Sequence, residues 1–180
     1  RGVLGLRVPE EYGGSAGALT QLGLAVEELA RGDFNVNYFP QLAGLAAGLI
    51  LHGDEAIKRR WLPPLASGEV TIGFALTEPG VGSDAAALST RAVRDGSDWV
   101  ISGEKASITF AGYADAVTVF ARTGGEGARG ITCFLVPLDL AGVERAVYAS
   151  AGSAATARGS LHFDDVRIPV DHQIGEEGTG

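Results

Sequence analysis

The sequence predicts an α+β fold in which an N-terminal helical domain, residues 1–68, precedes an antiparallel β-barrel or sandwich domain, residues 69–180. Two observations support this division. Before position 68, apolar residues recur three and four positions apart, as on one face of a helix. After it, short segments with apolar residues at every second position follow one another through turns without intervening helices, which is typical of an antiparallel sheet.

Composition limits the class of protein. With 46% apolar and 20% charged residues among 180, the chain is expected to be soluble and globular. A formal net charge of −8 argues against nucleic-acid binding, which needs clustered lysines and arginines. The single cysteine, Cys133, excludes an internal disulfide and favours a reducing compartment, the cytoplasm. The histidines at 52, 162 and 172 lack the spacing of a metal site.

The ends of the sequence carry no secretory signal pattern, and the chain opens inside an apolar pattern without a methionine. We therefore expect it to be a piece of a longer protein or a trimmed one.

The first two helices are expected over residues 18–31, which carry one apolar stripe, and within residues 36–51. The second segment has no charged residue, but it is shorter than the roughly 20 residues that span a bilayer. We expect no membrane span there, but a buried helix that begins near Pro40. Gly44 and Gly48 give this helix a face on which another helix could pack closely.

A third helix is expected over residues 54–61, with Asp54 as its N-cap. Acidic residues occupy its first turn and basic residues its last, as the helix dipole favours. Pro63 and Pro64 are expected to end it, because proline lacks the backbone N–H that a helix needs. Residues 1–66 contain no pattern that resembles a catalytic site.

The second domain should consist of strands joined by turns. Residues 94–98 predict the turn of a β-hairpin. In residues 115–122 and 131–137 apolar side chains alternate with others, which predicts strands. The full set of expected strands is 71–76, 88–93, 99–109, 115–122, 131–137, 143–148 and 160–168.

The segment 74–84, Phe-Ala-Leu-Thr-Glu-Pro-Gly-Val-Gly-Ser-Asp, is the strongest candidate for a binding site. A strand-like apolar run breaks there into a loop in which Gly80 and Gly82 can adopt positive φ and let a ligand approach the backbone. Thr77 and Ser83 add hydroxyl groups at either end. The combination suits a flat ligand with a polar edge and phosphates, although an ordinary glycine-rich turn remains an open alternative.

These residues also resemble a known family. The run 76–84, Leu-Thr-Glu-Pro-Gly-Val-Gly-Ser-Asp, is similar to the flavin-contacting signature of the acyl-CoA dehydrogenases. Residues 102–105, Ser-Gly-Glu-Lys, with Ile108 and Thr109, resemble the family's second flavin-contacting strand. Further similar stretches follow in order along nearly the whole chain, at residues 8–14, 27–31, 58–63, 163–169 and 175–178.

The resemblance implies an N-terminal helical domain and a middle β domain, while the family's C-terminal helical domain has no counterpart in the sequence. It further implies α,β-dehydrogenation of an acyl-CoA thioester, with FAD accepting the hydride. The resemblance places Phe74, Leu76 and Thr77 along the isoalloxazine, with Thr77 hydrogen-bonding its pyrimidine edge. It places Thr109 near flavin N5, with Ser107 and Ile108 on the same strand. Gly82 and Ser83 are the implied contacts of the pyrophosphate, and Ser83 and Arg129 those of the acyl-CoA.

Several positions depart from the family pattern. Ser107 stands where the family commonly has an aromatic residue over the flavin face, so a stacking surface is lost there. Residues 149–158 lack the family's Gly-x-Arg-x-Ser pattern, so the resemblance assigns them no contact to CoA. A lone arginine in a loop, such as Arg129, is more often simply solvated. The family's catalytic base comes from the missing helices. Glu78 is expected to fix the turn through hydrogen bonds to the backbone, so we nominate no base.

The resemblance also implies partners: an electron-transfer flavoprotein as acceptor and a homo-oligomeric complete protein. Two alternatives remain open. An oxygen-using flavin oxidase or hydroxylase on the same scaffold is one, since Ser107 could leave the flavin more accessible. The other is a non-catalytic binding or assembly module that lacks the C-terminal helices.

Overall fold

The computed structural model of the chain describes residues 2–152 and 154–180. The chain divides into two compact units, Arg1–Ile72 and Gly73–Gly180. The domain division between positions 68 and 69 that the sequence predicts stays a prediction. The α+β class itself is confirmed, since helices occupy the first unit and strands the second.

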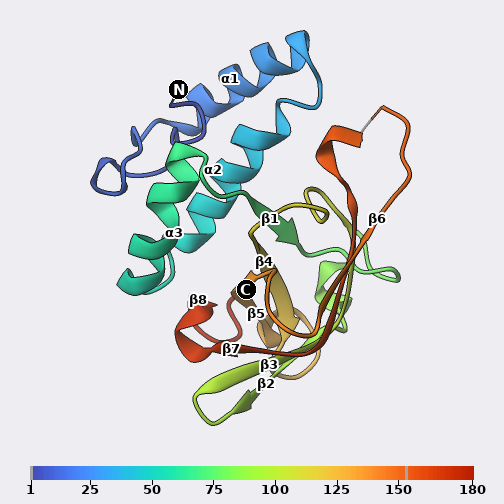
Figure 1. Cartoon of the computed structure of the whole chain (residues 1–180). Coiled ribbons are helices and arrows are strands. Elements are labelled where there is room, and N and C mark those ends of the chain that lie inside the picture. Colours follow the sequence, from blue (N-terminus) through green and yellow to red (C-terminus); the bar gives the residue numbers. More distant parts are fainter. Residues whose placement is uncertain (1, 153) are drawn as a thin grey trace. The chain divides into compact units, whose positions relative to one another are not determined.

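The first unit consists of a short 3₁₀ helix, Glu10–Tyr12, and three α-helices: α1 (Leu19–Gly32), α2 (Tyr38–Ile50) and α3 (Glu55–Ser67). The middle helix, α2, contacts both α1 and α3 (Figure 1). Close packing at Gly44 is confirmed, because a Cβ there would lie 2.6 Å from Leu22 Cδ2. The same expectation for Gly48 is wrong, since a Cβ at Gly48 would meet nothing within 4 Å.

Helix α3 begins as predicted but ends later. The side chain of Asp54 caps it by accepting a hydrogen bond from the Ile57 N–H at 3.0 Å. The predicted stop at Pro63 and Pro64 is wrong, because both prolines lie inside the helix, which ends at Gly68 with φ +82°. An interior proline costs a helix about 3 kcal/mol. Here α3 places apolar side chains in the core across the proline pair, and this packing offsets the cost; they are Ile57, Trp61, Leu62 and Leu65.

The second unit is one eight-stranded sheet with the order β6-β7-β3-β2-β4-β5-β8, in which β1 also pairs with β4 (Figure 1). The pairings along this order are antiparallel except for a short parallel contact of β2 with β4, so the sheet is mixed where a purely antiparallel one was expected. The strands are β1 (Ile72–Ala75), β2 (Arg91–Asp95), β3 (Asp98–Ile108), β4 (Ala116–Arg122), β5 (Ile131–Pro137), β6 (Val143–Val147), β7 (Gly159–Pro169) and β8 (Gln173–Ile174).

The predicted hairpin is confirmed: β2 and β3 pair in register from Arg91 with Ser102 to Asp95 with Asp98. Strand β3 then continues to Ile108 and pairs with β7, with register shifts between Ile101 and Gly103 and again between Lys105 and Ile108. Such irregularities bend a strand and re-aim its side chains, and they are frequent beside functional sites.

Strands β4 and β5 lie where the alternating sequences predict strands. Both of their faces are covered, since every residue of β5 and all but the last of β4 are buried. The non-alternating positions of these strands are filled by small or uncharged residues such as Ala116, Thr118 and Thr132, which can be buried at little cost. The pair therefore forms the centre of the β unit.

Candidate functional site

The two segments that the sequence singles out lie side by side. The N–H of Ala106 donates to the carbonyl oxygen of Thr77 at 2.8 Å, and Lys105 Nζ donates to the carbonyl oxygen of Leu76 at 3.0 Å. The end of β1 is thereby joined to the end of β3, although they are far apart in the sequence. The candidate residues at 74–77 and 107–109 therefore belong to one place in the fold.

Two hydroxyl groups remain available at this place. The side chains of Thr77 and Thr109 are half-buried, and within residues 2–152 and 154–180 neither hydroxyl has a hydrogen-bond partner. A partly buried hydroxyl ordinarily finds a partner, so these two are suited to a polar ligand. Phe74 is also half-buried and packs on Phe120, with ring centroids 5.2 Å apart. Ile108 is buried in the core, so only its backbone can contact a ligand.

The loop that follows is a tight turn with an open outer side. Glu78 and Val81 exchange both backbone hydrogen bonds, at 3.0 and 3.1 Å. Positive φ at Gly80 and Gly82 was expected, but neither adopts it. Instead, a Cβ at either glycine would meet nothing within 4 Å, so the backbone is accessible from outside. Ser83 is exposed beside them.

A buried ion pair holds this loop. Lys105 Nζ lies 2.9 Å from Glu78 Oε1, and the two side chains are 0% and 3% exposed. Glu78 also accepts hydrogen bonds from the N–H and hydroxyl of Ser89, both at 2.7 Å, and from the Thr90 N–H at 2.9 Å. The expectation that Glu78 binds backbone groups is confirmed, but the groups belong to the segment before β2 and not to its own turn.

The ion pair sets the charge of both partners. Burial alone would raise the pKa of Glu78, but the hydrogen bonds from Lys105, Ser89 and Thr90 outweigh it and lower that pKa to about 2. Burial lowers the pKa of Lys105, and the neighbouring Glu78 carboxylate opposes that shift. Glu78 is thus a fixed anion with all its acceptor positions occupied, which does not suit a group that must take up a proton.

Sequence reasoning missed Lys105, although a signal existed. Trp99 and Ile101 mark the buried face of β3, and Lys105 follows them at even spacing. A lysine on the inward side of a strand is almost never buried unless it is paired, so the pattern alone could have prompted a search for its partner.

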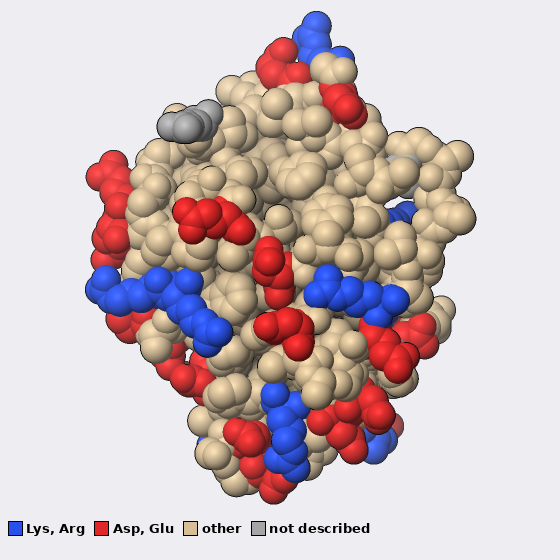
Figure 2. Space-filling model, in the orientation of Figure 1, with Lys and Arg blue, Asp and Glu red and all other residues tan. Residues whose placement is uncertain are grey.

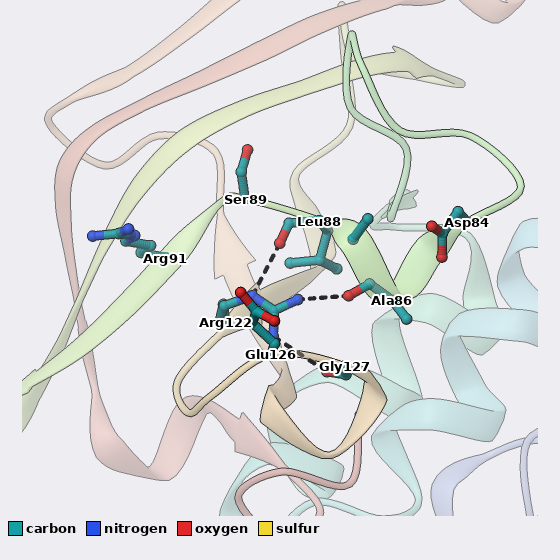
Figure 3. Close-up of a pocket in the computed structure, with 9 residues that line it drawn as sticks. Asp84, Ala86, Leu88, Ser89, Arg91, Arg122, Glu126 and Gly127 are labelled. Carbon is teal, nitrogen blue, oxygen red and sulfur yellow. Dashed lines mark hydrogen bonds between the residues drawn. The ribbon is translucent and has the colours of Figure 1, made fainter.

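Arg122, at the end of β4, joins two loops of the region. Its guanidinium donates to the carbonyl oxygens of Ala86 and Leu88, at 2.7 and 3.1 Å, and to those of Gly125 and Gly127, at 2.5 and 3.2 Å. A cavity of about 580 Å³ opens beside it, lined by Asp84, Ala86, Ala87, Leu88, Ser89, Arg91, Arg122, Glu126 and Gly127 (Figure 3). Arg122 thereby fixes the segment after Ser83 against the loop that leads to Arg129.

Replacing Arg122 with methionine is expected to lower the free energy of unfolding by about 2 kcal/mol, because several charge-assisted hydrogen bonds are lost together. Amide exchange in residues 85–88 and 123–127 should accelerate, which hydrogen-exchange mass spectrometry measures. Arg91→Met is the matched control: Arg91 lines the same cavity, but its side chain points away from Arg122 (Figure 3). Equal exchange in the two variants would contradict the role given to Arg122.

Two candidates remain, Arg129 and Ser107, and among the described residues neither is hydrogen-bonded to Thr77 or Thr109. Arg129 is exposed on a short 3₁₀ helix, Ala128–Gly130. Ser107 has φ +62°, and both of its backbone groups are bound by side chains of the 148–158 segment: its N–H donates to Tyr148 Oη at 3.2 Å, and its carbonyl accepts from Arg158 Nε at 3.3 Å.

Other kinds of site are not indicated. The described residues contain no group of three His, Cys, Asp or Glu side chains placed to hold a metal ion. No helix in the described part of the chain combines the length and the apolar character that crossing a membrane requires. On the face drawn in Figure 2, basic and acidic side chains are interspersed.

The chain is similar to known proteins along nearly its whole length. The family model "Acyl-CoA dehydrogenase, middle domain" matches residues 73–166, and "Acyl-CoA dehydrogenase, N-terminal domain" matches residues 1–69. The chain is 37% identical over 185 residues to the mitochondrial isobutyryl-CoA dehydrogenase of Dictyostelium discoideum, which covers 98% of this chain and 43% of that protein.

Solved structures extend the similarity to the fold. A glutaryl-coenzyme A dehydrogenase in complex with glutaryl-CoA matches with a TM-score of 0.94 and 33% identity, over 99% of this chain and 47% of that one. A glutaryl-CoA dehydrogenase from Mycobacterium smegmatis in complex with FADH2 matches with a TM-score of 0.86 and 36% identity, over 99% and 47%. The chain spans less than half the length of the curated relatives it matches first. By sequence and by fold, this chain belongs to the acyl-CoA dehydrogenase family.

Proposed function

We propose that this chain forms the flavin-binding portion of an enzyme that dehydrogenates an acyl-CoA thioester between Cα and Cβ. The observation that carries the proposal is the junction of residues 74–77 with residues 107–109, where the half-buried hydroxyls of Thr77 and Thr109 lack a partner in the described protein. Two polar contacts beside an aromatic side chain, Phe74, suit the edge of a planar heterocycle.

The residues fit FAD. Thr77 and Thr109 would hydrogen-bond the isoalloxazine, with Phe74, Leu76 and the backbone of Ile108 beside it, and Ser107 at the margin. The open outer side of the turn, at Gly82 and Ser83, would receive the pyrophosphate. When bound, FAD supplies the acceptor for the hydride that leaves Cβ. The chain's own part is to position the ring edge and to stabilise negative charge on it.

The acyl-CoA would approach from the side of Ser83 and Arg129, whose segments Arg122 holds together. A relative with this fold, a glutaryl-coenzyme A dehydrogenase, forms a complex with glutaryl-CoA. We assign no catalytic base in this chain. Glu78, the carboxylate nearest the candidate ring contacts in sequence, is fully occupied by Lys105, Ser89 and Thr90.

We further propose an electron-transfer flavoprotein as electron acceptor, a homo-oligomeric complete protein and a cytoplasmic location. The location is supported by the cysteine count, because a chain whose single cysteine is Cys133 has no internal disulfide, as is usual in a reducing compartment. Measuring oxygen consumption during turnover would distinguish this dehydrogenase from an oxygen-using relative. No specific feature of the described residues favours the oxygen-using alternative.

The direct test is an absorption spectrum of the purified chain after incubation with FAD and gel filtration. Retained flavin bands would support the proposal, and reduction of that flavin by an acyl-CoA would test the substrate class. A protein that elutes without flavin would contradict the claim that this chain forms the cofactor site.

Substitution of the two threonines tests the assigned contacts. Thr77→Ala and Thr109→Ala are each expected to lower the two-electron reduction potential of bound flavin by roughly 30–60 mV, the equivalent of one lost hydrogen bond to a charged group. Potentials can be measured by dye-coupled titration, with Thr20→Ala, an exposed threonine of α1, as control. Unchanged potentials in both variants would remove these contacts from the proposal.

A further inference from the structure

An aromatic side chain, that of Tyr148, reaches Ser107 from another part of the sheet. Ser107 lies at the register shift between Lys105 and Ile108 in β3 and has the left-handed backbone, φ +62°, which is unusual for a residue other than glycine. Its small side chain presents no aromatic surface beside Thr109.

Tyr148 follows the last residue of β6 and is held at three points. Its Oη accepts a hydrogen bond from the Ser107 N–H at 3.2 Å and lies 2.7 Å from Ser160 Oγ. Its backbone N–H donates to the carbonyl oxygen of Arg158 at 2.8 Å. Arg158 in turn donates to the Ser107 carbonyl, so the side chains of Tyr148 and Arg158 both bind the backbone of Ser107.

Tyr148 is anchored by its hydroxyl and yet partly exposed. The residue is 40% exposed, although its hydroxyl is hydrogen-bonded at the site. Aromatic rings normally bury their faces, and a ring that is held by its polar end with its body exposed is a preorganised contact surface. The hydroxyl bonds to the amide of Ser107, which is two residues from Thr109.

We propose that Tyr148 supplies the aromatic contact for the bound isoalloxazine that Ser107 does not provide. The inference rests on the proposed flavin-binding function and adds a residue to it. Tyr148 lies outside both segments that carry the predicted cofactor contacts, so only the fold brings it to the site. Its ring would pack on the flavin beside Thr109, while Ser107 and Ser160 orient its hydroxyl.

The test uses the fluorescence lifetime of FAD bound to the full chain, together with the Kd for FAD. A tyrosine in contact with an isoalloxazine shortens this lifetime, because the phenol transfers an electron to the excited ring and then recovers it, whereas a phenylalanine does not. Tyr148→Phe is therefore expected to lengthen the lifetime several-fold and to change the Kd less than threefold. Tyr148→Ala should raise the Kd roughly tenfold, since the whole ring contact is lost.

Tyr113→Phe is the matched control. Tyr113 is also 40% exposed, and its hydroxyl also anchors the 148–158 segment, by donating to the carbonyl oxygen of Ala155 at 3.1 Å. Its lifetime and Kd should equal those of the unsubstituted chain. If the unsubstituted chain retains FAD but Tyr148→Phe leaves the lifetime unchanged, this inference is overturned and the proposed function stands. If the unsubstituted chain retains no FAD, both are overturned.

Discussion

Replacing Lys105 with methionine is expected to lower the free energy of unfolding by about 3–5 kcal/mol, because Glu78 would remain buried without its cation. The same change removes the hydrogen bond to the Leu76 carbonyl, so the backbone that carries Thr77 should loosen as well. Chemical denaturation at neutral pH measures the first effect. The second should appear as faster amide exchange in residues 76–81.

A second lysine variant separates the loss of the Glu78–Lys105 ion pair from the loss of any lysine. Lys58, the chain's other lysine, is half-buried on α3 and forms no ion pair among the described residues. Lys58→Met should change stability by no more than about 0.5 kcal/mol. The double variant Glu78→Gln/Lys105→Met should regain part of the loss, since no uncompensated charge is left. A single Lys105→Met variant as stable as the control would refute the account of the pair.

Acid should destabilise the protein over a pH range that is set by the pKa values of Glu78 in the folded and unfolded states. Its pKa is about 2 in the folded state, below its ordinary value of 4.5. A carboxyl group whose pKa is lowered by folding stabilises the folded state above the unfolded-state pKa, and that contribution is lost as the pH falls towards the folded-state pKa. The difference between the two values corresponds to about 3 kcal/mol, most of which should disappear between pH 5 and pH 2.5.

Denaturant titrations at a series of pH values measure this loss, but other carboxyl groups also titrate there. The informative quantity is therefore the difference between variants. Glu78→Gln should start from a lower stability at pH 7 and then lose about 2–3 kcal/mol less than the unsubstituted chain on acidification. Glu104→Gln, which changes an exposed carboxylate on the same strand, should keep the original pH dependence. Identical slopes for all three proteins would contradict the low pKa of Glu78.

The fold was largely predictable because the two periodicities of the sequence are clear. The errors arose where tertiary packing outweighs a local preference. Pro63 and Pro64 should end α3 by local rules, but the apolar side chains on either side of them are buried and keep the helix together. The parallel contact between Arg91 of β2 and Arg122 of β4 depends on strand order, which hydrophobic alternation does not encode.

The site was predictable only in part, and for a different reason. Thr77 and Thr109 could be selected because they lie in short, recognisable motifs, and the structure brings the two motifs together. Arg122 and Tyr148 could not, since each acts through contacts with segments that are distant in the sequence, and neither stands in a distinctive pattern. Lys105 lay inside a recognised motif, but its role depends on burial beside Glu78, which only the assembled sheet creates.

The strand order also bears on how the protein aggregates. The apolar, buried strands β4 and β5, which have the character of cross-β-forming segments, lie inside the strand order, with β4 between β2 and β5 and β5 between β4 and β8. The strand order ends at β6, which exposes the charged side chains of Glu144 and Arg145, and at β8, which has two residues, while β1, which pairs with β4 outside this order, has four. Charged or very short edges discourage another molecule from adding a strand. Fibril formation should therefore follow unfolding of the β unit and not precede it.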